Sequence, residues 1–406
     1  MDKPQQHLLD ALRAALTGGV PSSCPGTPEE WRALLDLAAE QRLLPLVLDV
    51  LVPAARTAGM EEEALRPLRR EVIQGAVAQG ARTRRIEGLC AALDREGLRP
   101  LLVKGLACRR LYPKPDLRLS GDEDLLARDG DLEAIHRALT GAGLVTQEGD
   151  SLGRAQVVTY ADPATGLRLE LHRRLFPEES EAYGGMNACF AEAFRHPVSL
   201  GGGIWTLCPQ EHLLYLILHS LKHFLHSGFG IRQVCDICLA GAAWGAEVDW
   251  PRLFRDLEAF QGGCFAAGLF TIGEEVLGLG GGYPAGLRAE LARDPAPDVA
   301  PLLEDLLSGG VYGGNTEARR HSSLITLHAA EGKGERSLLR TVFPSAKELS
   351  RAYPYLEKAP WQLPRAWASR VLRYAAAGRG GAASAPESLA IGERRVALLR
   401  KYKVIR

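Results

Sequence analysis

Two aspartates separated by one residue are the strongest chemical signal in this sequence. Asp122 and Asp124 precede apolar residues in a segment predicted to be a β-strand. Because successive side chains of a strand point to opposite faces, both aspartates are expected on one face, and Glu123 on the other, where it needs solvent or a basic partner. Two such carboxylates suit Mg²⁺ or Mn²⁺ held together with substrate phosphates. The pair indicates phosphoryl or nucleotidyl transfer; a solvated acidic pair at a strand end is the alternative.

Two histidines four residues apart, His219 and His223, form a second candidate site. On a helix this spacing places both rings on one face, which is a common arrangement of metal ligands. Ser220 stands where a zinc protease of the H-E-x-x-H type has its glutamate. The sequence therefore favours histidines that line a cleft, and a metal-dependent hydrolase that also uses Asp236 is the less favoured alternative.

The cysteines give little indication of a disulfide framework. Eight of them are scattered along 406 residues, which is the usage of reduced and mostly buried thiols. Only Cys235 and Cys238 have a spacing found in zinc sites, and no second pair follows at the distance of a zinc ribbon. Two core thiols on one helix are the favoured interpretation, with structural zinc as the alternative.

The overall charge provides no attraction to a polyanion. The 49 basic and 49 acidic residues cancel, so binding to nucleic acid or to an anionic membrane would require a local basic patch. No apolar run approaches the roughly 20 residues that span a bilayer. The polar first residues lack the pattern of a signal peptide. We therefore expect a cytoplasmic protein with no membrane partner.

Three regions that must position these residues are predicted from the hydrophobic period. Residues 1–97 are predicted to be helical, because Thr27-Pro28-Glu29-Glu30 has the composition of a helix start and apolar residues recur at helical spacing. Residues 98–207 alternate between strand-like and helix-like segments, which predicts a mixed sheet with helices packed on it. Residues 208–406 return to a mainly helical pattern. The predicted fold class is α+β.

The order of segments in the middle region resembles a known superfold. The apolar run Leu101-Leu102-Val103 ends at Lys104-Gly105 and is followed by a predicted short helix, a proline-punctuated loop and the aspartate strand. This order is similar to the core of polymerase-beta-type nucleotidyltransferases. In that superfold a glycine turn lets backbone amides approach a triphosphate, the D-x-D pair holds metal, and a third carboxylate lies on a neighbouring strand. Glu170 is the best-placed candidate for that third acid, with an ordinary surface residue as the alternative.

More specifically, the chain resembles the bacterial family of uncharacterised nucleotidyltransferases. The stretches that carry this resemblance are Leu102-Val103-Lys104-Gly105, Arg118 to Leu126, Leu169-Glu170-Leu171-His172, Pro209-Gln210-Glu211 with His219, His223, Arg232 and Asp236, and, farther on, Phe343-Pro344, Tyr353-Pro354-Tyr355 and Leu363-Pro364. Two positions depart from the wider superfold. Lys104-Gly105 replaces the common glycine-serine pair, and Glu123 stands where an aliphatic residue is usual.

The resemblance implies a metal-dependent enzyme that moves a nucleoside monophosphate from a nucleoside triphosphate, such as ATP, to a hydroxyl acceptor with release of pyrophosphate. Mg²⁺ or Mn²⁺ is the implied cofactor. A small molecule, or a peptide or protein hydroxyl, is favoured as acceptor over RNA, and a non-catalytic module that binds nucleotide or a partner on the same fold is the alternative. The implied catalytic and metal-binding residues are Asp122, Asp124 and Glu170, and the implied nucleotide-binding residues are Lys104, Gly105, Arg118, His219, His223 and Arg232.

Overall fold

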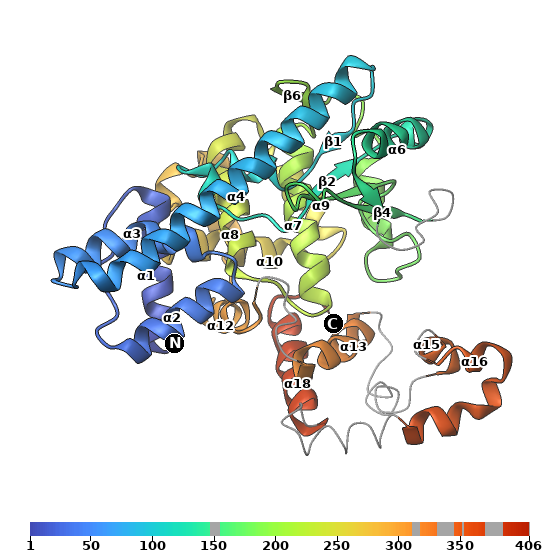
Figure 1. The fold of residues 1–406 in the computed structure, drawn as a ribbon. Helices are drawn as coiled ribbons and strands as arrows, with labels where there is room; N and C mark the ends of the chain where they lie inside the picture. Colours follow the sequence, from blue (N-terminus) through green and yellow to red (C-terminus); the bar gives the residue numbers. More distant parts are fainter. Residues whose placement is uncertain (147–154, 311–316, 331–344, 351–352, 370–384, 406) are drawn as a thin grey trace.

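A computed structural model of the 406-residue chain describes residues 1–146, 155–310, 317–330, 345–350, 353–369 and 385–405. Helices come first along the chain. The side chain of Thr27 accepts a hydrogen bond from the backbone of Glu30 and caps the second helix, as the sequence predicts. The fourth helix has 34 residues and runs from the N-terminal helices to the sheet (Figure 1). These helices are α1 (Lys3–Thr17), α2 (Pro28–Glu40), α3 (Leu44–Thr57) and α4 (Glu62–Arg95).

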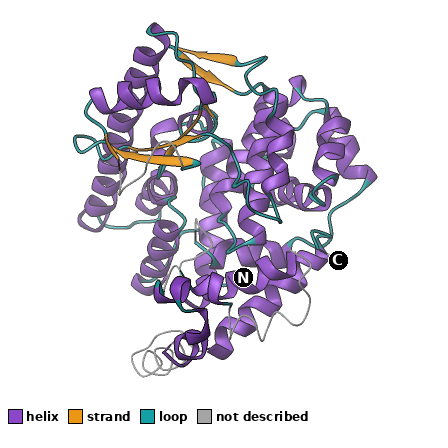
Figure 2. Ribbon diagram, turned by 90° about the vertical axis from the view of Figure 1, so that its right-hand side faces the viewer, coloured by secondary structure: helices purple, strands orange, loops and turns teal. Residues whose placement is uncertain are grey.

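Seven strands of the described chain form one mixed sheet. Their order is β3-β4-β5-β2-β1-β7-β6. The pairs β2–β5 and β1–β7 are parallel, and the other neighbours are antiparallel. Figure 2 shows the strands at one end of a largely helical molecule. The strands are β1 (Leu101–Leu102), β2 (Glu123–Leu126), β3 (Val145–Thr146), β4 (Val157–Ala161), β5 (Arg168–His172), β6 (Val198–Gly201) and β7 (Ile204–Thr206).

Helices cover both faces of the sheet. On one face, alternate strand residues such as Leu125 and Leu169 pack with apolar side chains of α4 and α6 (Leu132–Gly141). On the other face, Leu126 and Leu101, the first residue of β1, belong to a larger cluster that includes α7 (Pro209–Leu225). Because successive side chains of a strand point to opposite faces, alternate residues of each strand contact different helical layers. Asp124 of β2 therefore faces α7.

The largest buried cluster joins side chains from α1–α3, the sheet, α7 and the helices that follow. Residues Ala346–Trp367 contribute a separate small cluster around Leu356. Other α-helices in the described residues are α5 (Leu106–Arg109), α8 (Ile231–Trp244), α9 (Trp250–Glu258), α10 (Gly263–Glu275), α11 (Ala285–Arg293), α12 (Ala300–Ser308), α13 (Glu317–Ala330), α15 (Ala346–Leu349), α16 (Tyr355–Lys358) and α18 (Ala385–Lys401).

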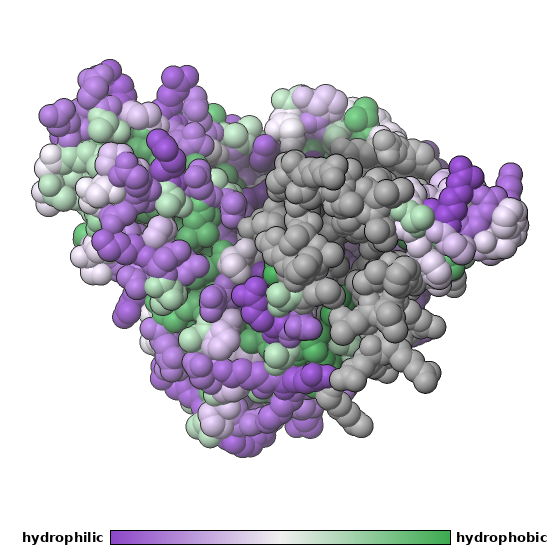
Figure 3. Space-filling view, turned by 90° about the horizontal axis from the view of Figure 1, so that it is seen from below, coloured by the Kyte–Doolittle hydropathy of each residue, from purple (hydrophilic) through white to green (hydrophobic). Residues whose placement is uncertain are grey.

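Among the described helices, none combines the length and the apolar composition that crossing a membrane requires. Seen from below, the described surface mixes polar and apolar residues, with the polar ones prominent at its edges (Figure 3). The α+β prediction is confirmed as a mixed sheet packed with many helices.

Candidate functional site

Asp124 of β2 and Glu170 of β5 meet on the face of the sheet that α7 covers. These two strands are parallel neighbours, and their register places Asp124 opposite Glu170 and Leu126 opposite His172. Directly opposed residues share a face, so Asp124, Glu170 and His172 project together. One ligand atom from each of these three side chains lies within 4.8 Å of the other two. The strand pairing thus creates an oxygen- and nitrogen-rich group that could hold a cation.

His172 lies between the two carboxylates. Its Nε2 is 3.3 Å from Oε2 of Glu170 and 3.9 Å from Oδ1 of Asp124. The neighbouring His172 lowers the pKa of Glu170, whereas burial raises the pKa of Asp124. Oδ1 of Asp124 is buried and accepts no hydrogen bond within the part of the chain that the structure describes. A buried carboxylate oxygen with no hydrogen-bond donor fits a site for a divalent cation.

Lys104 supplies the positive charge beside the aspartates. Because β1 and β2 are antiparallel, Val103 and Lys104, which follow β1, lie beside the start of β2, and Nζ of Lys104 is 3.5 Å from Oδ2 of Asp124. Lys104 also holds the pKa of Asp122 below its usual value. Asp122 lies one residue before β2 and is half-buried, outside the three-residue group but within its electrostatic reach. Both aspartates therefore face one buried ammonium group.

Glu123 points to the opposite face of the sheet. Of the two possibilities expected there, solvent or a basic partner, the structure shows a basic partner. Its Oε1 accepts a hydrogen bond from Nη1 of Arg109 at 2.5 Å, and its Oε2 accepts one from the backbone N–H of Leu106 at 2.7 Å. Gly105 has φ +64°, and a Cβ there would lie 2.0 Å from Oε2 of Glu123. The missing side chain of Gly105 leaves space for the protein's own carboxylate.

The two arginines expected at the nucleotide, Arg118 and Arg232, are buried and form hydrogen bonds within the protein. Arg118 forms a bidentate ion pair with Asp236 of α8, with N–O distances of 2.7 and 2.5 Å. Nη1 of Arg232 donates to the carbonyl oxygen of Leu119 at 2.5 Å. Both guanidinium charges act on Asp122, whose pKa they help to lower after the larger effect of Lys104.

The helix α7 carries the basic side chains that face the carboxylates. The rings of His219 and His223 are 4.6 Å apart, as expected for one helix face. Burial, followed by the charge of Lys104, lowers the pKa of His219 well below its usual value. Burial and Lys104 also lower the pKa of Lys222, while Asp124 and Glu170 act in the opposite direction. The α7 side chains therefore share one electrostatic environment with the acidic group.

The three residues expected to bind metal in the hydrolase alternative, His219, His223 and Asp236, are not brought together as metal ligands. Asp236 accepts hydrogen bonds from Arg118 and from the hydroxyl of Tyr112, which lies 2.8 Å away. Among the described residues, His219, His223 and Asp236 do not form a three-residue group with metal-ligand spacing.

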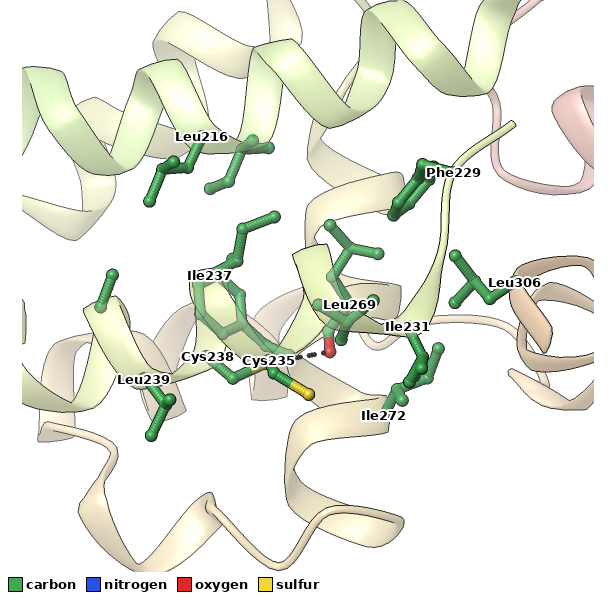
Figure 4. Close-up of a cluster of buried hydrophobic side chains, with 14 of the residues drawn as sticks. Leu216, Phe229, Ile231, Cys235, Ile237, Cys238, Leu239, Leu269, Ile272 and Leu306 are labelled. Atoms are coloured by element: carbon green, nitrogen blue, oxygen red, sulfur yellow. Dashed lines mark hydrogen bonds between the residues drawn. The ribbon is translucent and has the colours of Figure 1, made fainter. Parts of the chain in front are cut away.

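The paired cysteines are core thiols. Cys235 and Cys238 lie among apolar side chains of α8 and α10, and Sγ of Cys238 is 3.5 Å from the carbonyl oxygen of Leu269 (Figure 4). Burial raises the pKa of Cys238 to about 12. Within the described residues neither belongs to a group that could hold zinc, which supports the favoured interpretation.

Two residues of the site, His172 and Lys222, have no role in the sequence prediction. Each has a signal in the sequence, because His172 follows Glu170 by two residues on a strand and Lys222 follows His219 by three on a helix. Residues with these spacings share a face.

Comparison with known proteins identifies one family. Residues 27–278, more than half of the chain, match the family model described as "Uncharacterised nucleotidyltransferase". The match includes the sheet, α7 and α8 and ends before the C-terminal stretches of the resemblance. Neither the curated proteins nor the solved structures gave a significant match.

Proposed function

This chain belongs to the uncharacterised nucleotidyltransferase family, and on that premise we propose that it is a metal-dependent nucleotidyltransferase. It transfers a nucleoside monophosphate from a nucleoside triphosphate to a hydroxyl acceptor and releases pyrophosphate. The observation that carries the proposal is the convergence of Asp124, Glu170 and His172 on adjacent parallel strands, with the Lys104 ammonium 3.5 Å from Asp124. We further propose a polymerase-beta-type core, supported by the order β1, glycine turn, α5, β2 and by the acid on the parallel neighbour β5.

Asp122, Asp124 and Glu170 are the proposed ligands of Mg²⁺ or Mn²⁺, because they offer the oxygen donors that these ions prefer. Bound metal supplies charge neutralisation at the phosphates and a lower pKa for the acceptor hydroxyl. His172 lies where it can orient the Glu170 carboxylate through its Nε2. Glu170 is half-buried and is the candidate acceptor of the hydroxyl proton.

Lys104 and Lys222 are the proposed partners of the triphosphate. Both ammonium groups lie near the acidic group and act as point charges, which tolerate several phosphate positions. His219 and His223 line the same side from α7. In this proposal the phosphate charge is neutralised by Lys104, two residues after β1, and by Lys222 of α7.

The acceptor is proposed to enter from the far end of β2. A cavity of about 550 Å³ lies there, at the carboxyl ends of β2 and β5. Lys104 lies at the other end of β2, because β1 runs antiparallel to β2. In-line displacement requires the attacking hydroxyl and the leaving pyrophosphate on opposite sides of the phosphorus. The cavity volume suits a small molecule, and its lining combines aromatic side chains with arginines, two of which form ion pairs with Asp129. Among the lining residues are Arg128, Arg173, Arg174, Phe190 and Phe194.

Calorimetric titration with ATP, GTP, CTP and UTP, each with Mg²⁺ or Mn²⁺, tests the proposal. The unaltered chain should bind at least one nucleotide in a metal-dependent manner, and the double variant Asp122→Asn/Asp124→Asn should lose that binding while it stays folded. The substitutions relieve the repulsion between the two aspartates but also remove the counter-charges of the buried Lys104 ammonium, so circular dichroism must confirm that the double variant is folded. Glu133→Gln, exposed on α6, is the control and should bind normally.

Pyrophosphate release with a panel of hydroxyl acceptors then separates an enzyme from a non-catalytic binding module. Metal-dependent binding without pyrophosphate release from any acceptor would favour the module. No binding of any nucleotide by the unaltered chain would overturn the transferase proposal.

A further inference from the structure

A buried ion pair lies directly behind the turn that carries Asp122. The guanidinium of Arg118 donates from Nε and Nη2 to the two carboxylate oxygens of Asp236, at 2.7 and 2.5 Å. Only 1% of Arg118 and 3% of Asp236 are exposed. Bidentate pairs of this kind fix orientation as well as distance. The pair therefore connects α8 rigidly to the segment before β2.

The third nitrogen of the same guanidinium reaches the turn itself. Nη1 of Arg118 donates to Oγ of Ser120 at 2.8 Å, and Nη1 of Arg109 donates to the same oxygen at 2.6 Å. The backbone N–H of Ser120 donates to Oε1 of Gln79 in α4 at 2.9 Å. Ser120, two residues before Asp122, is thus held from three directions.

A phosphate-binding role for Arg118 conflicts with this arrangement. All three guanidinium nitrogens already donate hydrogen bonds within the protein. To reach a phosphate, Arg118 would have to leave the buried Asp236 carboxylate without a counter-charge, which is strongly unfavourable. The arrangement suits a supporting role, in which the pair fixes the backbone that presents the Asp122 ligand.

We propose that Arg118 and Asp236 are positioning residues that hold Asp122 in place for metal binding and do not touch the nucleotide. This inference rests on the metal site of the proposed function. Residues that orient metal ligands contribute substantially to affinity, because a displaced ligand coordinates poorly.

The test measures Mn²⁺ affinity without nucleotide, by the electron paramagnetic resonance signal of free Mn²⁺, in Asp236→Asn and Arg118→Lys. Asp236→Asn should weaken Mn²⁺ binding about 10- to 100-fold. Arg118→Lys keeps the buried charge but loses the fork geometry, so its loss should be smaller. It also serves as the test if Asp236→Asn does not fold.

Asp162→Asn is the matched control. Asp162 is a buried aspartate that accepts a hydrogen bond from Arg85, and it follows β4 away from the carboxylate group. Its substitution should lower stability without changing Mn²⁺ affinity. Hydrogen exchange of residues 118–124 is a second readout that needs no metal, and it should become faster in Asp236→Asn but not in the control.

Each result decides the proposal. Unchanged Mn²⁺ affinity in folded Asp236→Asn and Arg118→Lys overturns it, and so does a loss in Arg118→Lys that is confined to ATP binding, which would indicate a direct phosphate contact. If the unaltered chain binds no Mn²⁺, the metal site of the proposed function fails, and hydrogen exchange alone decides whether the ion pair holds the turn. In that event unchanged exchange at 118–124 overturns the positioning role.

Discussion

The carboxylate of Glu123 fills the space beside Gly105 that any side chain at position 105 would need. A Cβ on Gly105 would lie 2.0 Å from Oε2 of Glu123 and 3.0 Å from the carbonyl oxygen of Asp122. The backbone there has φ +64° and ψ −111°, a combination that glycine adopts readily and other residues do not. Gly105 is therefore required by the protein's own packing.

Gly105→Ala should destabilise the protein by about 2–4 kcal/mol, from backbone strain and from displacement of Glu123 from Leu106 and Arg109. Urea unfolding measures this change. Gly88→Ala is the control, because position 88 is exposed within α4 and a Cβ there meets nothing within 4 Å. Its free energy of unfolding should rise by up to about 1 kcal/mol. Equal effects of the two substitutions would contradict this explanation.

Single residues also mark the limit of sequence prediction. The alternation of the aspartate strand predicted that Glu123 needs solvent or a basic partner on the other face, and the structure gives it a basic partner. The identity of that partner, Arg109, depends on how α5 packs on β2. In the same way, the partner of Arg118 lies 118 residues later in the chain. Periodicity predicts the face that a side chain occupies, but not which distant residue it meets there.

At the scale of elements, α7 brings the basic groups to the acidic face of the sheet. Lys222 is mostly buried there, with its Nζ 6.0 Å from the ring centre of Phe176. Burial lowers the pKa of Lys222, so folding disfavours its charged form while the site is metal-free. Such an ammonium group is retained at a cost in stability, which is typical of a functional residue.

Lys222→Met should therefore weaken ATP binding about 10-fold or more without lowering stability, because it removes a charged contact to phosphate and a buried charge together. Calorimetry with ATP and with AMP, together with urea unfolding, measures both effects. AMP binding should change less. Lys114→Met removes an exposed lysine and is the control. Unchanged ATP affinity together with a loss of stability would argue that Lys222 is structural.

Elements with a clear start signal or hydrophobic pattern were predictable, and the short hairpin β6–β7 was not. Helix α2 has its predicted cap at Thr27, and α7 begins at Pro209 as its sequence indicates. The hairpin β6–β7 was not predicted, because its strands are short and Gly201-Gly202-Gly203 between them has no apolar alternation. All three glycines have positive φ, which a tight turn allows.

At the scale of the whole molecule, stability depends on histidines buried beside the sheet. His212 at the start of α7 has its Nε2 2.8 Å from the carbonyl oxygen of Val103, and Oγ1 of Thr206 lies 3.1 Å from its Nδ1. Burial lowers the pKa of His212 to about 4. His212 is therefore neutral in the folded protein at pH values where the unfolded chain already binds a proton.

Stability should consequently fall as the pH falls from about 6.5, the ordinary pKa of histidine, towards about 4, and should not depend on His212 above that window. The difference between these two pKa values corresponds to a loss of about 3 kcal/mol in the free energy of unfolding. The free energy of unfolding in urea, measured at several pH values, should fall less steeply in His212→Gln than in the unaltered chain. His196→Gln, at an exposed position, is the control. Parallel curves for His212→Gln and the unaltered chain would contradict this assignment.

The overall architecture was predictable only in outline. The change of hydrophobic period predicted a mixed sheet between helical regions, and the structure confirms a mixed sheet packed with helices. The largest buried cluster nevertheless joins side chains of helices far apart in the chain, from α1 to α18. Hydrophobic period gives the kind of each element but not which helical layers merge, because merging depends on contacts between residues far apart in the sequence.

The hydrogen bond from the Leu106 amide to Glu123 has a consequence for selectivity. A backbone N–H at the start of a helix can donate a directional hydrogen bond to an anion. The N–H of Leu106 already donates to the Glu123 carboxylate of the same chain. A triphosphate in this site would be recognised mainly by ammonium groups on long, flexible side chains, which respond to charge and distance more than to shape. The site should therefore distinguish nucleotides by the number of their phosphates more sharply than by the stereochemistry of substituted phosphates.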